Sequence, residues 1–209
     1  MNNLILLRHG QSQWNLENRF TGWEDVPLSS KGLEEAKYAG HLMLKNKIKI
    51  DLIFSSILQR ANKTAELTIT EMNLDYLWNE KNLIVTKDIS LNERDYGDLV
   101  GLNKEETAIK YGKEQVHIWR RSYNVPPPGG ESLENVVDRV KPYFEKHIEP
   151  EIIKEKNILV VAHGNSLRAS MIQVGLYKPE EISNIELPTG IPFVITFDKG
   201  KVNSSKFLS

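Results

Sequence analysis

The sequence contains no cysteine, which excludes disulfide bonds, thiol nucleophiles and cysteine-ligated zinc or iron–sulfur sites. It has no excess of basic charge, because 27 Lys and Arg residues face 28 Asp and Glu residues, and a nucleic-acid-binding surface usually shows as a basic excess. No apolar run approaches the ~20 residues that span a bilayer, and the N-terminus does not resemble a signal peptide. We therefore expect a cytoplasmic protein with no nucleic-acid or membrane partner.

The length and composition indicate one globular domain, residues 1–209. At roughly 100–200 residues per domain, the chain is long enough for one domain with a modest cap. Apolar residues make up 40% of the chain and charged residues 26%, which fits a protein with a substantial core.

Short apolar runs predict the strands of a mostly parallel sheet. Leu4–Leu7 and Ile158–Ala162 are wholly apolar, Leu52–Phe54 is a third candidate and Leu83–Thr86 a weaker fourth. Such runs suit strands buried on both faces, although periodicity alone does not exclude a helix. We expect Phe193–Phe197 to close the sheet as an edge strand.

Between these runs, four segments carry apolar residues at helical spacing: 31–45, 58–72, 133–148 and 167–176. Ser29 or Ser30 is available to cap the first segment and Ser132 the third, in which Pro142 predicts a kink. Alternating strands and helices are typical of an α/β fold, so we predict a three-layer sandwich whose mostly parallel central sheet is flanked by helices.

The polar stretch from Glu93 to Gly130 breaks this alternation. It carries the pair Arg120-Arg121 and ends in three prolines and two glycines. We predict that residues 93–130 form a helical cap insertion over the C-terminal ends of the strands.

Two histidines follow buried-strand candidates directly. His9-Gly10 follows the first run and His163-Gly164 follows Ile158–Ala162. Ligands of parallel α/β sheets bind beyond the carboxyl ends of the strands, so the two rings would meet at one rim if the strands are neighbours. Each glycine would let the backbone approach a ligand closely. The remaining histidines lie in helical segments without a partner motif and are expected to be structural: His41, His117 and His147.

Several chemistries suit this arrangement. A hydrogen-bonded structural role is the ordinary interpretation of one histidine, but two at strand ends favour a site. A zinc site from His9 and His163 lacks a third ligand at suitable spacing. Phosphoryl transfer fits better, because a neutral imidazole can attack phosphorus while Arg8 and Arg60 stabilise the oxygens. No Walker-type glycine loop is present, which argues against a kinase of that class.

An ordered set of motifs along nearly the whole chain resembles the cofactor-dependent phosphoglycerate mutases of the histidine phosphatase superfamily. An Arg-His-Gly triplet alone would be a weak signal, whereas the ordered set is specific. The matching segments are Leu7–Ser12, Trp14–Asn15, Phe20–Trp23, Leu91–Gly97, Gly101–Lys104, Trp119–Arg121, Pro128–Ser132, Ala162–Arg168 and Pro188–Pro192.

The resemblance implies a catalytic set. His9 would be the nucleophile that transiently carries the phosphoryl group, and Glu93 would be the acid and base for the substrate hydroxyls. Arg8, Arg60 and His163 would surround the phosphoryl group, assisted by Asn15 and the backbone of Gly164. For an arbitrary glutamate, a salt bridge would be the better interpretation.

The resemblance also implies the substrate and the rest of its site. The reaction would interconvert 3-phosphoglycerate and 2-phosphoglycerate in glycolysis and gluconeogenesis, primed by 2,3-bisphosphoglycerate and without a metal. Thr21 and Gly22 would contact the carboxylate end of the substrate, and Asn165 would also contact the ligand. Four cap residues would hold its carboxylate and its non-reacting phosphate: Tyr96, Lys104, Arg120 and Arg121. Adjacent arginines point ~100° apart on a helix, so both reach one ligand only near the helix end or axis.

Departures from the family pattern concern closure and assembly. The bridge Val125–Pro127 is short, the stretch Leu77–Asn82 is long, and the C-terminal tail is short. Family members commonly form homodimers or homotetramers. Three rival interpretations remain: a histidine-type phosphatase acting on a small phosphorylated metabolite, a binding module without catalysis, and a metal-dependent hydrolase.

Overall fold

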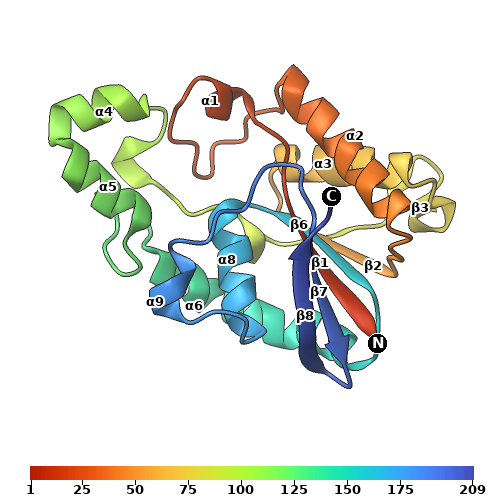
Figure 1. The fold of residues 1–209 in the computed structure, drawn as a ribbon. Helices are drawn as coiled ribbons and strands as arrows, with labels where there is room; N and C mark the ends of the chain where they lie inside the picture. Colours follow the sequence, from red (N-terminus) through yellow and green to blue (C-terminus); the bar gives the residue numbers. More distant parts are fainter.

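A six-stranded sheet lies between two layers of helices in the computed structural model, which describes residues 1–209 (Figure 1). Two further short strands pair with each other outside it. In chain order the strands are β1 (Asn2–Arg8), β2 (Leu52–Ser55), β3 (Trp78–Asn79), β4 (Asn82–Leu83), β5 (Thr86–Lys87), β6 (Ile158–Ala162), β7 (Phe193–Asp198) and β8 (Lys201–Phe207).

The strand order in the main sheet is β5-β2-β6-β1-β7-β8. Strands β5, β2, β6 and β1 run parallel, whereas β7 and β8 are added antiparallel. In the β1–β6 pair, Leu4 is opposite Ile158 and Arg8 is opposite Ala162. The predicted mostly parallel sheet is confirmed, and β1 and β6 are neighbours that end at the same edge.

The α-helices, in chain order, are α1 (Gln13–Leu16), α2 (Ser30–Lys45), α3 (Gln59–Glu71), α4 (Lys104–Tyr111), α5 (Lys113–Arg121), α6 (Leu133–Tyr143), α7 (Glu149–Ile153), α8 (Gly164–Gln173) and α9 (Pro179–Ile182). Short 3-10 turns occur at Asp75–Leu77, Ile89–Leu91 and Gly97–Leu99. The predicted helix N-caps are confirmed. The Ser29 hydroxyl accepts a hydrogen bond from the Gly32 N–H, and the Ser132 hydroxyl accepts one from the Asn135 N–H.

The core has two halves, one on each face of the sheet. Successive side chains of a strand point to opposite faces. Leu4 and Leu6 accordingly pack with α6 and α8, whereas Ile5 and Leu7 pack with α2 and α3. The side chains of residues 4–7 are all fully buried, which explains why β1 contains a continuous apolar run.

Pro142 marks an irregularity in the third predicted helix. The chain stays helical, but a π-helical turn at Phe144–Ile148 follows α6 directly. Proline has no N–H to donate to the preceding turn, so the regular hydrogen-bond ladder is interrupted there.

Two strand predictions were wrong in detail. Phe193–Phe197 is not an edge strand, because β8 pairs along its outer side. The β8 sequence is polar, exposed and carries lysines, which hid it from an apolar-run criterion and is usual for an edge. The run Leu83–Thr86 is divided between β4 and β5 rather than forming one strand.

The stretch from Glu93 to Gly130 contains α4 and α5, which project beyond the sheet (Figure 1). Hydrogen bonds attach it to the loop before α2. The Phe20 N–H donates to the Leu102 carbonyl, and the Gly101 N–H donates to the Phe20 carbonyl. The N-terminal loop and the cap segment therefore form one connected wall.

Candidate active site

His9 and His163 lie side by side at the carboxyl edge of the sheet. Each directly follows its strand, and the neighbouring pair Arg8 and Ala162 is in register. The ring centroids are 4.9 Å apart, with an interplanar angle of 60°. The prediction that the two rings meet at one rim is confirmed.

Gly10 serves the packing of this turn rather than access to a ligand. A Cβ atom at Gly10 would collide with the backbone of Gly32, so only glycine fits. At Gly164 the space for a Cβ atom instead faces Arg168, Glu93 and Arg8, at 3.5 to 3.9 Å. The expectation of close backbone approach to a ligand therefore suits Gly164 alone.

The environment of His9 keeps the ring neutral and leaves one nitrogen free. Burial lowers its pKa well below 6.5, and the positive charges of Arg60 and Arg8 add to this effect. The Nδ1 atom lies 2.6 Å from the Gly10 carbonyl oxygen. Because a carbonyl only accepts, Nδ1 must carry the proton, and Nε2 retains its lone pair.

His163 is fully buried beside His9. Its Nε2 lies 2.8 Å from the Ser56 hydroxyl, while its Nδ1 is buried without a hydrogen-bond partner. Burial lowers the pKa of His163 well below 6.5, assisted by the charge of Arg60. The ring is therefore neutral, and its second nitrogen is left unsatisfied by the protein.

Arg60 lies in the first turn of α3 and is almost completely buried. Its two terminal nitrogens donate to the carbonyls of Glu24 and Gly22, each at 2.8 Å. Burial lowers the pKa of Arg60 to about 10, with opposing contributions from Glu93 and Asp25. It stays charged at neutral pH while supporting the loop that contains Gly22.

Glu93 presents one carboxylate oxygen to the protein and one to the cavity. Its Oε1 accepts hydrogen bonds from the N–H of Arg94 at 2.8 Å and from the backbone and side-chain nitrogens of Asn165 at 3.2 and 3.0 Å. Burial raises its pKa, but the Arg94 hydrogen bond, the charge of Arg8 and the Asn165 hydrogen bond together lower it below the ordinary value. The group is therefore a carboxylate when no ligand is bound.

The cap contributes cations from the opposite wall. Arg120 and Arg121 are the last two residues of α5, and both line the same cavity as His9. Arg121 forms an ion pair of 2.6 Å with Glu186. Burial lowers the pKa of Lys104, whose ammonium lies 5.9 Å from the ring centroid of Phe20. Two adjacent arginines reach one ligand only near a helix end, and Arg120 and Arg121 lie at the C-terminal end of α5.

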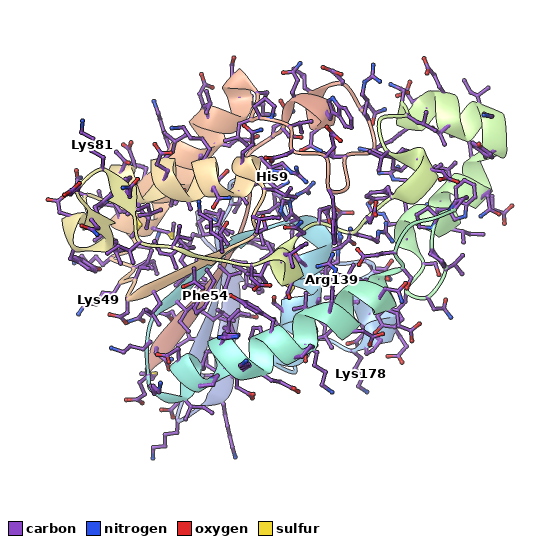
Figure 2. The ribbon with its side chains drawn as sticks, turned by 180° about the vertical axis from the view of Figure 1, so that it is seen from behind. His9, Lys49, Phe54, Lys81, Arg139 and Lys178 are labelled. Atoms are coloured by element: carbon purple, nitrogen blue, oxygen red, sulfur yellow. The ribbon has the colours of Figure 1, made fainter.

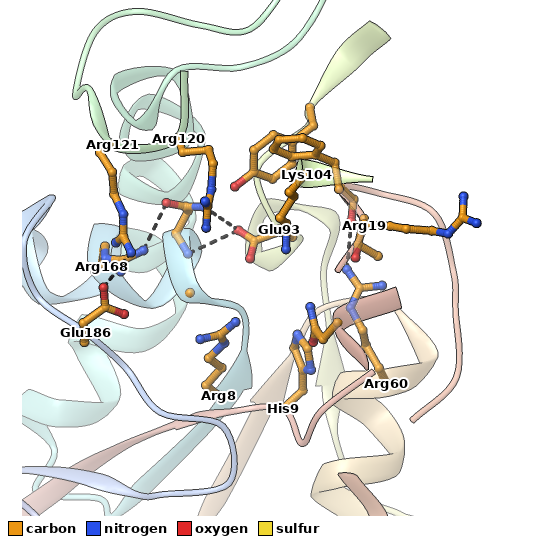
Figure 3. Close-up of a pocket in the computed structure, with 17 residues that line it drawn as sticks. Arg8, His9, Arg19, Arg60, Glu93, Lys104, Arg120, Arg121, Arg168 and Glu186 are labelled. Atoms are coloured by element: carbon orange, nitrogen blue, oxygen red, sulfur yellow. Dashed lines mark hydrogen bonds and ion pairs between the residues drawn. The ribbon is translucent and has the colours of Figure 1, made fainter. Parts of the chain in front are cut away.

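These groups enclose a polar cavity of about 190 Å³ (Figure 3). In this view Glu93 lies between His9 and Arg8 on one side and Arg120 on the other. The cavity is lined by Arg8, His9, Asn15, Arg19, Phe20, Thr21, Gly22, Arg60, Glu93, Tyr96, Lys104, Arg120, Arg121, Gly164, Asn165, Arg168 and Glu186.

Comparison with known proteins identifies the family. Residues 4–207 match the histidine phosphatase superfamily (branch 1). The chain belongs to the histidine phosphatase superfamily. A 2,3-bisphosphoglycerate-dependent phosphoglycerate mutase from Methylocella silvestris is 49% identical over 203 residues, covering 97% of this chain and 96% of that protein. A mutase of the same name from Parvibaculum lavamentivorans is 44% identical over 208 residues, covering 99% and 96%.

Solved structures share the fold. The alpha-ribazole phosphatase from Shigella flexneri superposes with a TM-score of 0.78 at 24% identity, covering 99% of this chain and 95% of that one. The resemblance identified from the motifs is confirmed. The α/β sandwich of this histidine phosphatase superfamily member is confirmed as well.

All residues predicted for the site line the cavity except His163, which contacts His9 from beneath it. The sequence interpretation missed four lining residues: Arg19, Phe20, Arg168 and Glu186. Arg168 follows Asn165 by three residues in α8, so helical spacing could have placed it on the same face. Its guanidinium donates to the Asn165 side-chain oxygen at 3.3 Å. Nothing local marks Glu186, which lies in the loop before β7.

Two further observations concern metal sites and membranes. No cluster of three or more His, Cys, Asp or Glu side chains occurs that could hold a metal ion. No helix combines the length and the apolar character needed to cross a membrane.

Proposed function

We propose that this enzyme is an isomerase that interconverts 3-phosphoglycerate and 2-phosphoglycerate and is primed by 2,3-bisphosphoglycerate. The observation that carries the proposal is the second set of ligand-binding groups across the cavity from His9: Tyr96, Lys104, Arg120 and Arg121. Hydrolysis of a phosphate ester needs charge stabilisation around one phosphoryl group, whereas a mutase must also hold the far end of a bisphosphate. Full-length relatives 44 to 49% identical carry the mutase name.

The charge of the cavity suits a bisphosphate. Seven cations and two carboxylates line it: Arg8, Arg19, Arg60, Lys104, Arg120, Arg121 and Arg168 against Glu93 and Glu186. Each phosphate monoester carries about −1.5 to −2 at pH 7, so a bisphosphate with one carboxylate carries about −4 to −5. The local excess of five positive charges matches this ligand.

His9 is the nucleophile in this proposal. Its Nε2 lone pair attacks the phosphorus, and the N–P bond forms as the P–O bond to the donor breaks. The hydrogen bond from Nδ1 to Gly10, 2.6 Å long, supports the tautomer that this attack requires. Arg8, Arg60 and neutral His163 stabilise the phosphoryl oxygens, and the N-terminus of α8 at Gly164 adds backbone N–H groups.

Glu93 is the acid and the base. It gives a proton to the leaving alkoxide when His9 is phosphorylated, and it takes a proton from the attacking hydroxyl when the phosphoryl group returns. The carboxylate is ionised in the free enzyme, as the return step needs. A polyanionic ligand raises the pKa of Glu93 by like-charge repulsion, which makes the protonated form accessible for the forward step.

The remaining lining groups orient the substrate. The Thr21 hydroxyl is buried without a protein partner, which suits a ligand carboxylate or hydroxyl. Asn15 borders the phosphoryl end of the cavity in this proposal, and Gly22 lies with Thr21 at the end that takes the carboxylate. Asn165 bridges Glu93 and Arg168, so it can couple ligand binding to the acid–base group.

Residues 1–209 form a single mutase domain in this proposal, with residues 93–130 as a cap that shields the phosphohistidine from water. The N-terminal loop would move with the cap, because the Lys104 N–H donates to the Asn18 carbonyl at 2.8 Å in addition to the Phe20 hydrogen bonds. We further propose a cytoplasmic homodimer or homotetramer that uses no metal and binds neither nucleic acid nor membranes. The Lys and Arg side chains supply the positive charge that a metal would otherwise provide.

A quenched mutase assay tests the function. Purified enzyme is incubated with 3-phosphoglycerate, with and without 2,3-bisphosphoglycerate, quenched, and 2-phosphoglycerate is then measured in a separate enolase step. The separation matters because enolase itself needs Mg²⁺. We expect conversion that the bisphosphate stimulates and that EDTA leaves unchanged.

Each alternative has its own outcome in this assay. Release of inorganic phosphate without 2-phosphoglycerate would identify a phosphatase. Loss of activity in EDTA that divalent metal restores would refute the metal-free mechanism. Binding of phosphoglycerates without turnover would indicate a module that has lost catalysis.

A further inference from the structure

Arg139 does not line the cavity, yet its guanidinium reaches the backbone that carries Glu93. It projects from α6 (Figure 2), and its guanidinium donates to the main-chain carbonyls of three residues between Ser90 and Glu93. Its Nη1 donates to the Ser90 carbonyl at 2.7 Å, and its Nη2 donates to the carbonyls of Asn92 at 3.1 Å and Glu93 at 2.9 Å. One side chain thus binds the main chain before and at the acid–base residue.

Glu131 fixes the guanidinium and the backbone on the other side of Glu93. Its carboxylate accepts two hydrogen bonds from Arg139, with Nε–Oε1 at 2.8 Å and Nη2–Oε2 at 3.0 Å. The same Oε2 accepts from the Asp95 N–H at 2.8 Å, and the Glu131 N–H donates to the Asp95 carbonyl at 2.9 Å. A bidentate pair of this kind restricts orientation as well as distance.

Trp23 supplies the third contact. Its indole N–H donates to the Glu93 carbonyl at 2.6 Å, and its ring lies 5.6 Å from the guanidinium carbon of Arg139. The Glu93 carbonyl therefore accepts from both side chains. Trp23 is 37% exposed, so its indole is not simply a core residue.

The Glu93 backbone lies outside regular secondary structure. No helix or strand includes residues 92–96, which lie between the turn Ile89–Leu91 and the turn Gly97–Leu99. The carboxylate of Glu93 must still meet a leaving oxygen on one donor and a hydroxyl on one acceptor. A misplacement of about 1 Å in such a group costs about a hundred-fold in rate.

We propose that Arg139, Glu131 and Trp23 are positioning residues that hold the Glu93 backbone so that its carboxylate can transfer protons in the mutase reaction. This inference rests on the proposed function. A positioning role can be distinguished from an ordinary packing role. A loss of packing would slow the reaction whether or not the leaving group needs a proton, whereas a misplaced Glu93 would slow only the reaction that needs one.

The test compares two phosphoryl donors in single-turnover phosphorylation of His9. The alkoxide of 2,3-bisphosphoglycerate needs a proton to leave, whereas the nitrophenolate of p-nitrophenyl phosphate leaves without one. Glu93→Gln defines the signature: phosphorylation from the bisphosphate is lost and that from the aryl phosphate is retained. We expect Arg139→Lys and Trp23→Phe to slow the first donor by about ten-fold and the second by less than about two-fold.

Two variants keep the test decisive. Trp23→Phe keeps an aromatic ring beside Arg139 and removes the N–H donor together with the five-membered ring of the indole. Because Trp23 is 37% exposed, little core packing is lost, and this variant carries the test if Arg139→Lys is unstable. The matched control is Lys141→Gln on the same helix, where an exposed pair with Glu145 is 3.9 Å long and touches no part of the Glu93 backbone. The control should leave both rates unchanged.

The outcomes distinguish the two levels of the argument. If wild-type enzyme is not phosphorylated by the bisphosphate, the proposed function fails and the inference with it. If Glu93→Gln slows both donors equally, Glu93 is not the acid and the inference is overturned. If Glu93→Gln shows the signature but the positioning variants slow both donors equally or neither, the proposed function stands and the positioning role is refuted.

Discussion

Arg120 and Arg121 are adjacent in α5 but are held differently, and this difference predicts unequal effects when each is removed. Arg121 is paired with Glu186 at 2.6 Å (Figure 3), whereas Arg120 forms no ion pair. The Arg120 backbone is fixed instead, because its carbonyl accepts from Arg94 at 3.0 Å. Arg120 is therefore free to bind substrate at once, while Arg121 must first give up part of an existing contact.

The magnitudes follow from these contacts. A charge-assisted hydrogen bond contributes about 1.5–3 kcal/mol, so Arg120→Ala should lower kcat/KM by about 10- to 150-fold. The Arg121–Glu186 pair is partly exposed, with side-chain exposures of 34% and 66%. Pairs of this kind are worth about 0.2–1 kcal/mol, so Arg121→Ala should cost about 1.4- to 5-fold less than Arg120→Ala. By the same reasoning, Glu186→Gln should lower KM by a similar factor.

Steady-state kinetics with 3-phosphoglycerate in the quenched assay would measure all three variants at one ionic strength. Lys110→Ala is a suitable control, because it removes a cap cation that does not line the cavity. A larger loss for Arg121→Ala than for Arg120→Ala, or a raised KM in Glu186→Gln, would refute the reasoning. Unchanged kinetics in Arg120→Ala would remove this residue from the site.

Two further predictions concern the histidines. His9→Ala should abolish the acid-labile phosphoenzyme, and labelling that persists in this variant would locate the nucleophile elsewhere. Burial lowers the pKa of His9 and His163, so below about pH 6.5 the unfolded chain binds protons that the native state does not. As the pH falls from about 6.5 toward the native pKa of each histidine, the free energy of unfolding should therefore decrease by up to about 1.4 kcal/mol per pH unit for each of them. Urea titrations of wild type and His9→Asn at several pH values would measure the difference in the slope of this free energy against pH. Identical slopes for the two proteins would contradict a buried neutral His9.

Much of the fold could be predicted because its signals are local. The apolar runs of β1 and β6 reflect burial on both faces of the sheet, and the hydroxyls of Ser29 and Ser132 mark helix starts that depend only on neighbouring N–H groups. The strand β8 escaped because an exposed edge strand has no apolar pattern to detect. Its place is decided by pairing with β7, a long-range contact.

The residues of the candidate site also differ in whether local sequence signals or long-range contacts indicate them. Most of the predicted residues were indicated by motifs that stand next to one another in the chain, such as Arg8-His9-Gly10 and Ala162-His163-Gly164. Arg168 was within reach of a helical-spacing argument. Glu186 was not, because it reaches the site only through tertiary packing, which brings it against Arg121, 65 residues away along the chain.

The sequence by itself determined to which family the chain belongs and which two histidines end buried strands. Through the family resemblance it also indicated which glutamate and which cap cations to expect beside them. Only the tertiary structure decided how these groups act on each other. The proton on His9 Nδ1 follows from the Gly10 carbonyl, the ionised state of Glu93 from the surrounding N–H groups and Arg8, and the anchoring of the Glu93 backbone from Arg139, Glu131 and Trp23. The physical reason is that residue type fixes which protons and charges a side chain can carry, whereas burial and partners, set by long-range packing, decide which state it adopts.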